Sequence, residues 1–533
     1  MQQINKKVVY YAIVVAFGGF VFGLDAALIS GVVSALTTEF TMSDWQVGLV
    51  VSAPSIGVLG ALCVAGLISD HLGRKKTLLI IAALYLISAI GSALAPTYEW
   101  LVMARFVGGL AFASLSLSAM YIGEIAPSEV RGKLVCVNQV NIVTGLAAAY
   151  FVNYGLAALA NSEITWVAAV GLDEATWRWV LGIEILPATV WLALLFTVPE
   201  SPRWLAMRDR WDEAKLVLSE HVYCDADRVE QEVLEIRQGD IVAQQAAPSM
   251  FRQLKLLVSN RYRAALLVGI ILAVVQPITG MNAILFYAPT IFEQVGGGEN
   301  VALLQSVLVG VISIVFAVLS LATIERFGRR RILLGGLACA AFSLSLCAWA
   351  FSQASYQLPA SVTGLFAEAS RLSSLVGVGF DSDVSFKSAL IESLGRELFL
   401  AHQNELLTSA IRVNPELVLV GILSFVASYQ YAMGPVMWVM LSEIFATRVR
   451  GVAIPLCAFV TSAVAMFVPL LFPWQLANFG ASSIFMSYAG FTVLGFVLIL
   501  WAAPETRNRS IEQIQRELEM RQSKYHAKTQ ETL

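Results

Sequence analysis

The sequence has few charged residues for its length. Only 14% of its 533 residues are Asp, Glu, Lys or Arg, whereas 57% are hydrophobic. Soluble globular chains carry roughly 25% charged residues, so this composition is typical of a protein whose main surroundings are lipid. The formal net charge of -3 provides no large basic field, which argues against nucleic-acid binding.

Residue types that build metal and catalytic centres are also scarce. The six cysteines contain no C-x-x-C pair, and the four histidines are scattered along the chain. We therefore expect no disulfide framework, no metal site and no bound cofactor. No motif brings together a nucleophile, a base and an orienting group, and no phosphate-binding loop is present, so we do not expect an enzyme.

Long apolar runs, by contrast, are abundant. A helix that spans a bilayer needs about 20 apolar residues, and about twelve such runs follow one another along the chain. They cover residues 8–33, 46–68, 77–95, 100–122, 134–157, 177–198, 263–290, 303–323, 332–352, 416–440, 452–472 and 483–503. The predicted fold class is an all-α membrane protein, because helices satisfy their own backbone hydrogen bonds in lipid.

The loops between these runs differ in charge. Basic residues gather in alternate loops, at both termini and in the segment 199–262, while most of the other loops have almost none. By the positive-inside rule we expect the basic loops and both termini to be cytoplasmic, with the chain in the cell (cytoplasmic or plasma) membrane.

Three short motifs occur twice in the same order. The sequence DHLGR (70–74) is matched by ERFGR (325–329), EIAPSEVRG (124–132) by EIFATRVRG (443–451), and PE (199–200) by PE (504–505). Such a repeat predicts two pseudo-symmetric six-helix halves. We assign residues 1–198 to the first half, 199–262 to a cytoplasmic helical linker, 263–503 to the second half and 504–533 to a cytoplasmic tail.

The second half is longer than the first between its matching motifs. The extra residues fall in an external loop at about 353–415. Apolar residues at helical spacing from Leu390 to Ile411 predict a small helical subdomain in this insertion.

Repeated charges surround the predicted basic loops. An acidic residue precedes an arginine by four positions in both halves, and further acidic and basic residues lie in the same predicted layer. Local polar contacts of this kind suit a cytoplasmic latch that is broken and remade as the halves rock; the alternative is that the charges only set the topology. The candidate latch residues are Asp70, Arg74, Glu124, Arg131, Glu325, Arg329, Glu443 and Arg450.

Three ionisable residues lie inside predicted spans: Asp25, Arg105 and Glu184. A charge at that depth is costly unless it is paired or faces water, so each is a candidate functional residue. An Asp–Arg pair in a cavity can take up and release a proton. The alternative is a static buried ion pair.

Polar and aromatic residues suited to a sugar also interrupt the spans. Amides both donate and accept hydrogen bonds, as sugar hydroxyls require, and an indole face packs on a sugar ring. Hydrogen bonding between helices is the alternative role. The candidates are Gln139, Asn141, Gln276, Asn282 and Trp438, and Pro277 with Gly280 predicts a broken seventh helix near Gln276.

Longer motifs resemble a known family. They are GLISDHLGRKK (66–76), YIGEIAPSEVRG (121–132), PESPRWL (199–205), QPITGMNAILFYAPTIF (276–292), GPVMWVMLSEIF (434–445) and PETRNRS (504–510). Together they resemble the sugar porter family of the major facilitator superfamily, and within it the bacterial xylose–proton symporters, over nearly the whole chain except 353–415.

The resemblance implies a secondary active transporter that imports a monosaccharide with a proton and is functional as a monomer. The alternatives are a facilitative sugar uniporter and a membrane sugar receptor that does not transport. Carried over residue by residue, it implies sugar contacts at Phe22, Gln139, Gln276, Asn282 and Trp438, and proton coupling at Asp25, Arg105 and Glu184.

The chain departs from the family pattern at several contact positions. It has Pro277 and Leu146 where glutamines are usual, Phe286 where a tyrosine is usual, and Thr461-Ser462 in place of an amide and a tryptophan. We therefore expect a pocket with fewer direct hydrogen bonds to the sugar.

Overall fold

The computed structural model describes residues 6–223, 225–246, 250–259, 261–296, 298–364, 367–380, 382–510, 513–518 and 520. Within these residues, 11 helical segments are long and apolar enough to span a membrane. The last, Arg448–Ala502, contains two of the predicted runs. They form two helices, because the backbone at Gly480, with φ 73° and ψ 165°, is not helical. Every predicted run is thus accounted for, and the all-α membrane fold is confirmed.

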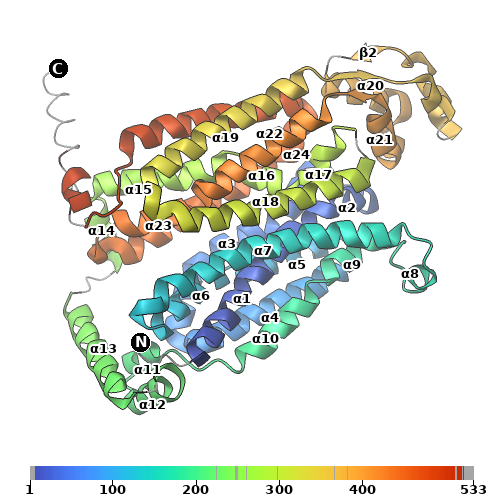
Figure 1. The fold of residues 1–533 in the computed structure, drawn as a ribbon. Coiled ribbons are helices and arrows are strands. Elements are labelled where there is room, and N and C mark those ends of the chain that lie inside the picture. Colours follow the sequence, from blue (N-terminus) through green and yellow to red (C-terminus); the bar gives the residue numbers. More distant parts are fainter. Residues whose placement is uncertain are drawn as a thin grey trace, which may run out of the picture.

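The helices of the first half run back and forth along one bundle (Figure 1). They are α1 (Lys6–Leu28), α2 (Val33–Glu39), α3 (Asp44–Leu72), α4 (Arg74–Ala93), α5 (Tyr98–Ala111), α6 (Ser114–Ile125), α7 (Ser128–Ala160), α8 (Thr165–Ala169), α9 (Thr176–Gly182) and α10 (Ile185–Leu195). The fourth span is α5 with α6, and the sixth is α9 with α10.

The second half repeats this arrangement. Its helices are α15 (Arg263–Ile278), α16 (Met281–Phe286), α17 (Ala288–Glu293), α18 (Gly298–Phe327), α19 (Arg329–Ser352), α22 (Pro415–Tyr431), α23 (Met433–Ile444) and α24 (Thr447–Ala502). The predicted break in the seventh helix is confirmed: α15 ends at Ile278, and Gly280 has φ 89°. A Cβ atom at Gly280 would lie 2.4 Å from the Tyr488 ring, so glycine also allows α24 to approach.

Helices of the linker lie at one end of the bundle (Figure 1). They are α11 (Pro202–Met207), α12 (Trp211–Val217), α13 (Ala226–Ala246) and α14 (Met250–Leu257). α11 is tied to the first half by a hydrogen bond of 3.0 Å from the Trp204 indole to the Asp70 carbonyl, whereas α14 packs against α24. We call this end, which also carries the first described residues and Arg74 and Arg329, the basic end.

The insertion occupies the opposite end, here called the insertion end (Figure 1). It holds a three-stranded antiparallel sheet in the order β2 (Gly379–Phe380), β1 (Ser355–Gln357), β3 (Ile411–Arg412), followed in the chain after β2 by α20 (Asp383–Leu394) and α21 (Arg396–Ala410). The helical subdomain expected in the insertion is present as α20 and α21, but the sequence predicted neither the sheet nor the division into two helices. The strands are too short to show a periodic pattern, and Gly395, with φ 85°, ends α20 inside the predicted helical stretch.

Among the described residues, the buried apolar cluster that joins the two halves lies at the insertion end. One buried cluster combines first-half residues such as Leu28, Val47 and Tyr150 with second-half residues such as Leu285 and Phe472. A separate cluster around the basic end of the first half contains only residues between Val8 and Ile236. We call the shared contact surface the seam; α7 lies beside α18 there (Figure 1), and α3 lies beside α24.

The insertion has a hydrophobic core of its own, built from residues between Ala354 and Val413. Its ends also meet, because Ser355 pairs with Arg412 across the sheet. We therefore expect that replacing residues 356–411 by a two-residue turn leaves the membrane bundle folded, with Tm lowered by no more than about 5 °C. Size-exclusion chromatography and thermal unfolding in detergent measure this, and an aggregated product would show that the bundle needs the insertion.

Candidate functional site

A buried ion pair lies in the interior of the first half. Asp25 on α1 and Arg105 on α5 are only 1% and 2% exposed. The Arg105 guanidinium donates to the Asp25 carboxylate and, at 3.4 Å, to the Asp25 backbone carbonyl. The second carboxylate oxygen, Oδ2, has no hydrogen-bond partner among the described residues. Arg105 thus leaves one oxygen of the Asp25 carboxylate without a donor.

Glu184 joins this pair from the junction of α9 and α10. It is 3% exposed and lies close enough to Asp25 and Arg105 for direct electrostatic interaction. Its Oε1 has no hydrogen-bond partner within the described part of the chain. The structure therefore brings together all three charged residues that the sequence placed inside spans.

Phe22 connects this cluster to the predicted sugar contacts. It lies on α1 three residues before Asp25, so both side chains depend on the position of one helix. The Phe22 ring packs edge-to-face on Phe112, with 4.4 Å between ring centroids. A displacement of α1 would consequently move the charged and the aromatic residue together.

The other predicted sugar contacts keep polar or aromatic surface available. Gln139 on α7, Gln276 on α15 and Asn282 on α16 are half-buried, and Trp438 on α23 is 39% exposed. No hydrogen bond or ring contact joins any two of these residues and Phe22 among the described residues. Gln276 lies within reach of the Tyr429 hydroxyl. Among the described residues, the side-chain amides of Gln139 and Asn282 thus form no hydrogen bond.

Asn141, by contrast, is used between helices. Its side-chain amide donates to the Ala16 carbonyl on α1 at 2.9 Å. This contact corresponds to the alternative role considered for the amides, hydrogen bonding between helices. The Asn141 amide therefore forms a hydrogen bond between α7 and α1.

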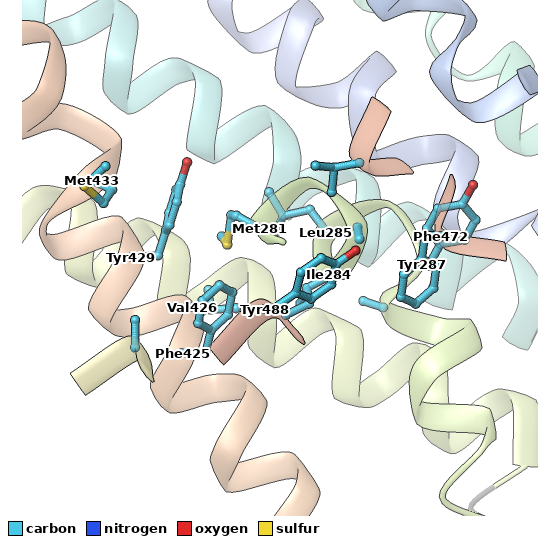
Figure 2. Packing of buried hydrophobic residues seen from close by; sticks show 14 of the residues in the cluster. Met281, Ile284, Leu285, Tyr287, Phe425, Val426, Tyr429, Met433, Phe472 and Tyr488 are labelled. Carbon is cyan, nitrogen blue, oxygen red and sulfur yellow. The ribbon is translucent and has the colours of Figure 1, made fainter. Parts of the chain in front are cut away.

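Buried hydrophobic residues pack around the break in the seventh helix (Figure 2). Met281, Ile284 and Leu285 of α16 pack with Phe425 and Tyr429 of α22 in one buried cluster. Tyr488 of α24 lies against the same segment, and its buried hydroxyl has no partner among the described residues. Sequence reasoning missed Tyr488, because only the packing of α24 brings it to the helix break.

At the basic end, each half contains one arginine between two carboxylates. Arg74 lies 3.1 Å from Asp70 and 3.0 Å from Glu124. The corresponding second-half contacts of Arg329 are 2.7 Å to Glu325 and 2.8 Å to Glu443. Two of these four ion pairs lie within the first half and two within the second, so in this conformation none of the four joins the halves. Their role as a latch stays a prediction.

Two further predicted latch residues lie outside this pattern. Arg450 donates to the backbone carbonyl of Phe445 at 3.1 Å rather than to a carboxylate. The side chain of Arg131 lies outside the described residues.

The repeated Pro-Glu motifs have a role that the sequence did not reveal. Glu200 accepts hydrogen bonds from the backbone amides of Arg74 and Lys75, at 2.9 and 3.1 Å, at the start of α4. Glu505 accepts equivalently from the Arg329 amide at 3.0 Å, at the start of α19. A carboxylate at these positions satisfies amides that have no helical partner and complements the helix dipole. The matching motif pairs gave the only signal for this contact.

Cavities open at the insertion end, away from these residues. One, of about 720 Å³, is lined by Gln353, Arg412, Val413, Asn414, Pro415 and Glu416. A second, of about 270 Å³, lies between α17, α18 and α22. Next to it, burial raises the pKa of Glu293 to about 8, and the charge of Glu299 acts in the same direction. None of the five predicted sugar contacts lines either cavity.

A bundle of apolar spans in two similar halves, with a broken seventh helix and buried charges, defines a multi-pass membrane transporter. The chain belongs to the sugar porter family of the major facilitator superfamily: the family described as "Sugar (and other) transporter" matches residues 11–368 and 397–518. The unmatched stretch between these ranges falls within the insertion, which holds α20.

Relatives with a described activity are transporters. The arabinose-proton symporter of Bacillus subtilis (strain 168) is 31% identical over 504 residues, which cover 94% of this chain and 92% of the relative. The D-xylose-proton symporter of Escherichia coli (strain K12) is 29% identical over 556 aligned positions, covering 96% of each chain. Among solved structures, the inward-open conformation of the xylose transporter XylE from E. coli has a TM-score of 0.70 at 26% identity, covering 96% of this chain and 99% of XylE.

A substitution at Gly73 tests whether the turn between α3 and α4 at the basic end requires glycine. Gly73 has φ 96° and ψ 165°, and a Cβ atom there would lie 2.3 Å from the Glu200 carboxylate. We expect Gly73→Ala to lower the free energy of unfolding by about 1–3 kcal/mol, because this backbone region is nearly restricted to glycine. Thermal unfolding in detergent measures the loss.

The matched control is Gly66→Ala inside α3, the helix that ends just before Gly73. No atom lies within 4 Å of a Cβ at Gly66, and its backbone is helical. We expect this variant to match the wild type or exceed it slightly. Equal stability of both variants would contradict the assigned role of Gly73.

Proposed function

We propose that this protein imports a monosaccharide by proton symport through alternating access of its two halves. The observation that carries the proposal is the buried cluster of Asp25, Arg105 and Glu184. Two carboxyl groups share one guanidinium there, so the cluster is neutral when it holds one proton. Burying a net charge in an apolar bundle is costly, which favours that protonated state until water enters.

Proton and sugar binding are connected through α1. Protonation of Asp25 weakens its attraction to Arg105 and so loosens the contact between α1 and α5. Since α1 also carries Phe22, the same movement changes the predicted sugar site. A proton taken up on one side can in this way accompany a sugar to the other.

The predicted sugar contacts come from both halves. Phe22 and Gln139 belong to the first half, whereas Gln276, Asn282 and Trp438 belong to the second. A sugar held between them contacts two bodies that rock against each other, as alternating access requires. The names of the arabinose and xylose relatives support a sugar as substrate and a proton as the coupled ion.

We assign the basic end to the cytoplasm and the insertion end to the outside of the cell membrane. The arginines of the basic end support this orientation by the positive-inside rule. The shared apolar core at the insertion end then corresponds to an inward-facing conformation. We further propose that the monomer is the functional unit, because each chain contains both halves of the sugar site.

The main alternative is a facilitator in which Asp25 is a static partner of Arg105. The extra hydrogen bonds from Arg105 to the Asp25 carbonyl are compatible with such a fixed pair. Uptake into proteoliposomes, with and without an inward proton gradient, separates the two functions. Symport requires accumulation above the external sugar concentration, which a facilitator cannot produce.

Asp25→Asn tests the proton role. The amide keeps the shape of the carboxylate but cannot take up a proton, so we expect gradient-driven accumulation to be abolished while sugar counterflow continues. Labelled pentoses and hexoses in proteoliposomes measure both. The control is Asp173→Asn, at an exposed loop position, which should accumulate sugar as the wild type does. Unchanged accumulation in Asp25→Asn would rule out Asp25 as the proton carrier.

Asn282→Ala tests the sugar site. Loss of one buried hydrogen bond should weaken sugar binding by roughly 1–2 kcal/mol, or about 5- to 30-fold in Kd. Binding of the transported sugar to purified protein, followed by calorimetry, measures the change. Asn161→Ala, at the exposed end of α7, serves as control and should bind normally. Wild-type affinity in Asn282→Ala would remove Asn282 from the site, and the same result in Gln276→Ala as well would remove the seventh helix.

A further inference from the structure

Two tyrosines donate hydrogen bonds to carbonyls that prolines leave without a helical partner. The Tyr150 hydroxyl donates to the Leu285 carbonyl at 2.6 Å, and the Tyr287 hydroxyl to the Pro469 carbonyl at 3.0 Å. In an α-helix, a carbonyl accepts from the amide four residues later. Those positions are Pro289 and Pro473, and proline has no amide hydrogen. Each tyrosine hydroxyl thus donates to a carbonyl whose usual donor, the amide four residues later, is missing because that residue is proline.

The two bonds differ in what they connect. Tyr287 and Pro469 both belong to the second half, so their bond persists if that half moves as a unit. Tyr150 lies on α7 of the first half, and Leu285 on α16 of the second. The Tyr150 bond therefore crosses the seam, in the broken helix that also carries Asn282.

The surroundings of Tyr150 exclude water in this conformation. Tyr150 is 0% exposed, and its hydroxyl and the Leu285 carbonyl form a fully buried bond. Across the seam, a Cβ atom at Gly310 of α18 would lie 2.7 Å from the Ala147 Cα and 3.1 Å from the Tyr150 ring. The two helices thus approach closely beside the Tyr150 ring, and the hydrogen bond itself is buried. Without Tyr150, the Leu285 carbonyl would be buried and unpaired, which costs free energy.

Opening of the insertion end removes the free-energy cost of breaking this hydrogen bond. Once the seam parts, the Leu285 carbonyl and the Tyr150 hydroxyl both gain access to water, which satisfies them equally well. The bond consequently contributes to one conformation and not to the other, and only such differential contributions shift a conformational equilibrium.

We propose that Tyr150 is a positioning residue of the transport cycle: its hydrogen bond to the Leu285 carbonyl selectively stabilises the conformation that is closed at the insertion end and holds α16 there. This inference rests on the proposed alternating access. The Tyr287 bond, made inside one half, fixes the shape of the broken helix in both conformations.

Distances between spin labels across the seam test the proposal. Asn161 and Asn300 are exposed at the insertion ends of α7 and α18, and cysteines there carry the labels. Cys63, Cys136, Cys224 and Cys339 are first replaced by serine, while the buried Cys347 and Cys457 remain. The measurement uses the full-length protein in lipid nanodiscs, without sugar.

We expect Tyr150→Phe to raise the ratio of the long-distance, open population to the closed one by roughly 2- to 10-fold, as loss of one buried hydrogen bond predicts. Tyr154→Phe deletes a hydroxyl one helical turn further along α7 and should leave the ratio unchanged. Gly310→Ala, which crowds the seam directly, is the positive control for opening.

Each outcome has one meaning. A wild-type ratio in Tyr150→Phe, with a clear shift in Gly310→Ala, would overturn the role of Tyr150, as would an equal shift in Tyr154→Phe. A single distance in the wild type that no added sugar, pH change or Gly310→Ala alters would instead contradict the rocking of the halves, and with it the proposed function.

Discussion

The cost of an unpaired charge inside an apolar bundle organises this structure. Asp25, Arg105 and Glu184 are nearly inaccessible to water, so each depends on the other two for its stability. Arg74 and Arg329 meet the same constraint at the basic end, where each lies between two carboxylates. Every one of these clusters has two carboxyl groups and one guanidinium, but the Asp70 and Glu325 side chains are exposed to water at the basic end, whereas Asp25 and Glu184 are buried. Burial of the excess carboxyl makes the interior cluster the site where a proton changes the energy most.

Proline and glycine determine where the helices break or turn. Gly280 breaks the seventh helix, and Pro289 removes an amide in the following segment. Gly73 and Gly328 form the equivalent turns at the basic end, and both admit a capping carboxylate, from Glu200 and Glu505 respectively. Rigid helices joined at such points suit a molecule whose halves move as bodies, because backbone change is confined to a few residues.

Much of the fold followed from the sequence, because spans are recorded in local composition and the halves in repeated motifs. The break at Gly280 and the charges at Asp25 and Arg105 were likewise visible as exceptions within apolar runs. Contacts between distant segments were not. The pairing of Tyr150 with Leu285 and the capping of α4 by Glu200 depend on packing between helices that no local pattern encodes. In the insertion, strands of two or three residues leave no periodic signal, and the sheet was missed.

In proton symport, sugar and proton cross the membrane together, so sugar-driven proton movement is the decisive measurement. Wild-type protein is reconstituted into vesicles containing a pH-sensitive dye, with no imposed proton gradient, and the transported sugar is added outside. Proton symport predicts acidification of the lumen that follows the sugar concentration and disappears with a protonophore. Sugar entry with no change in lumenal pH would contradict it, and Asp25 would then be a structural partner of Arg105 in a facilitator.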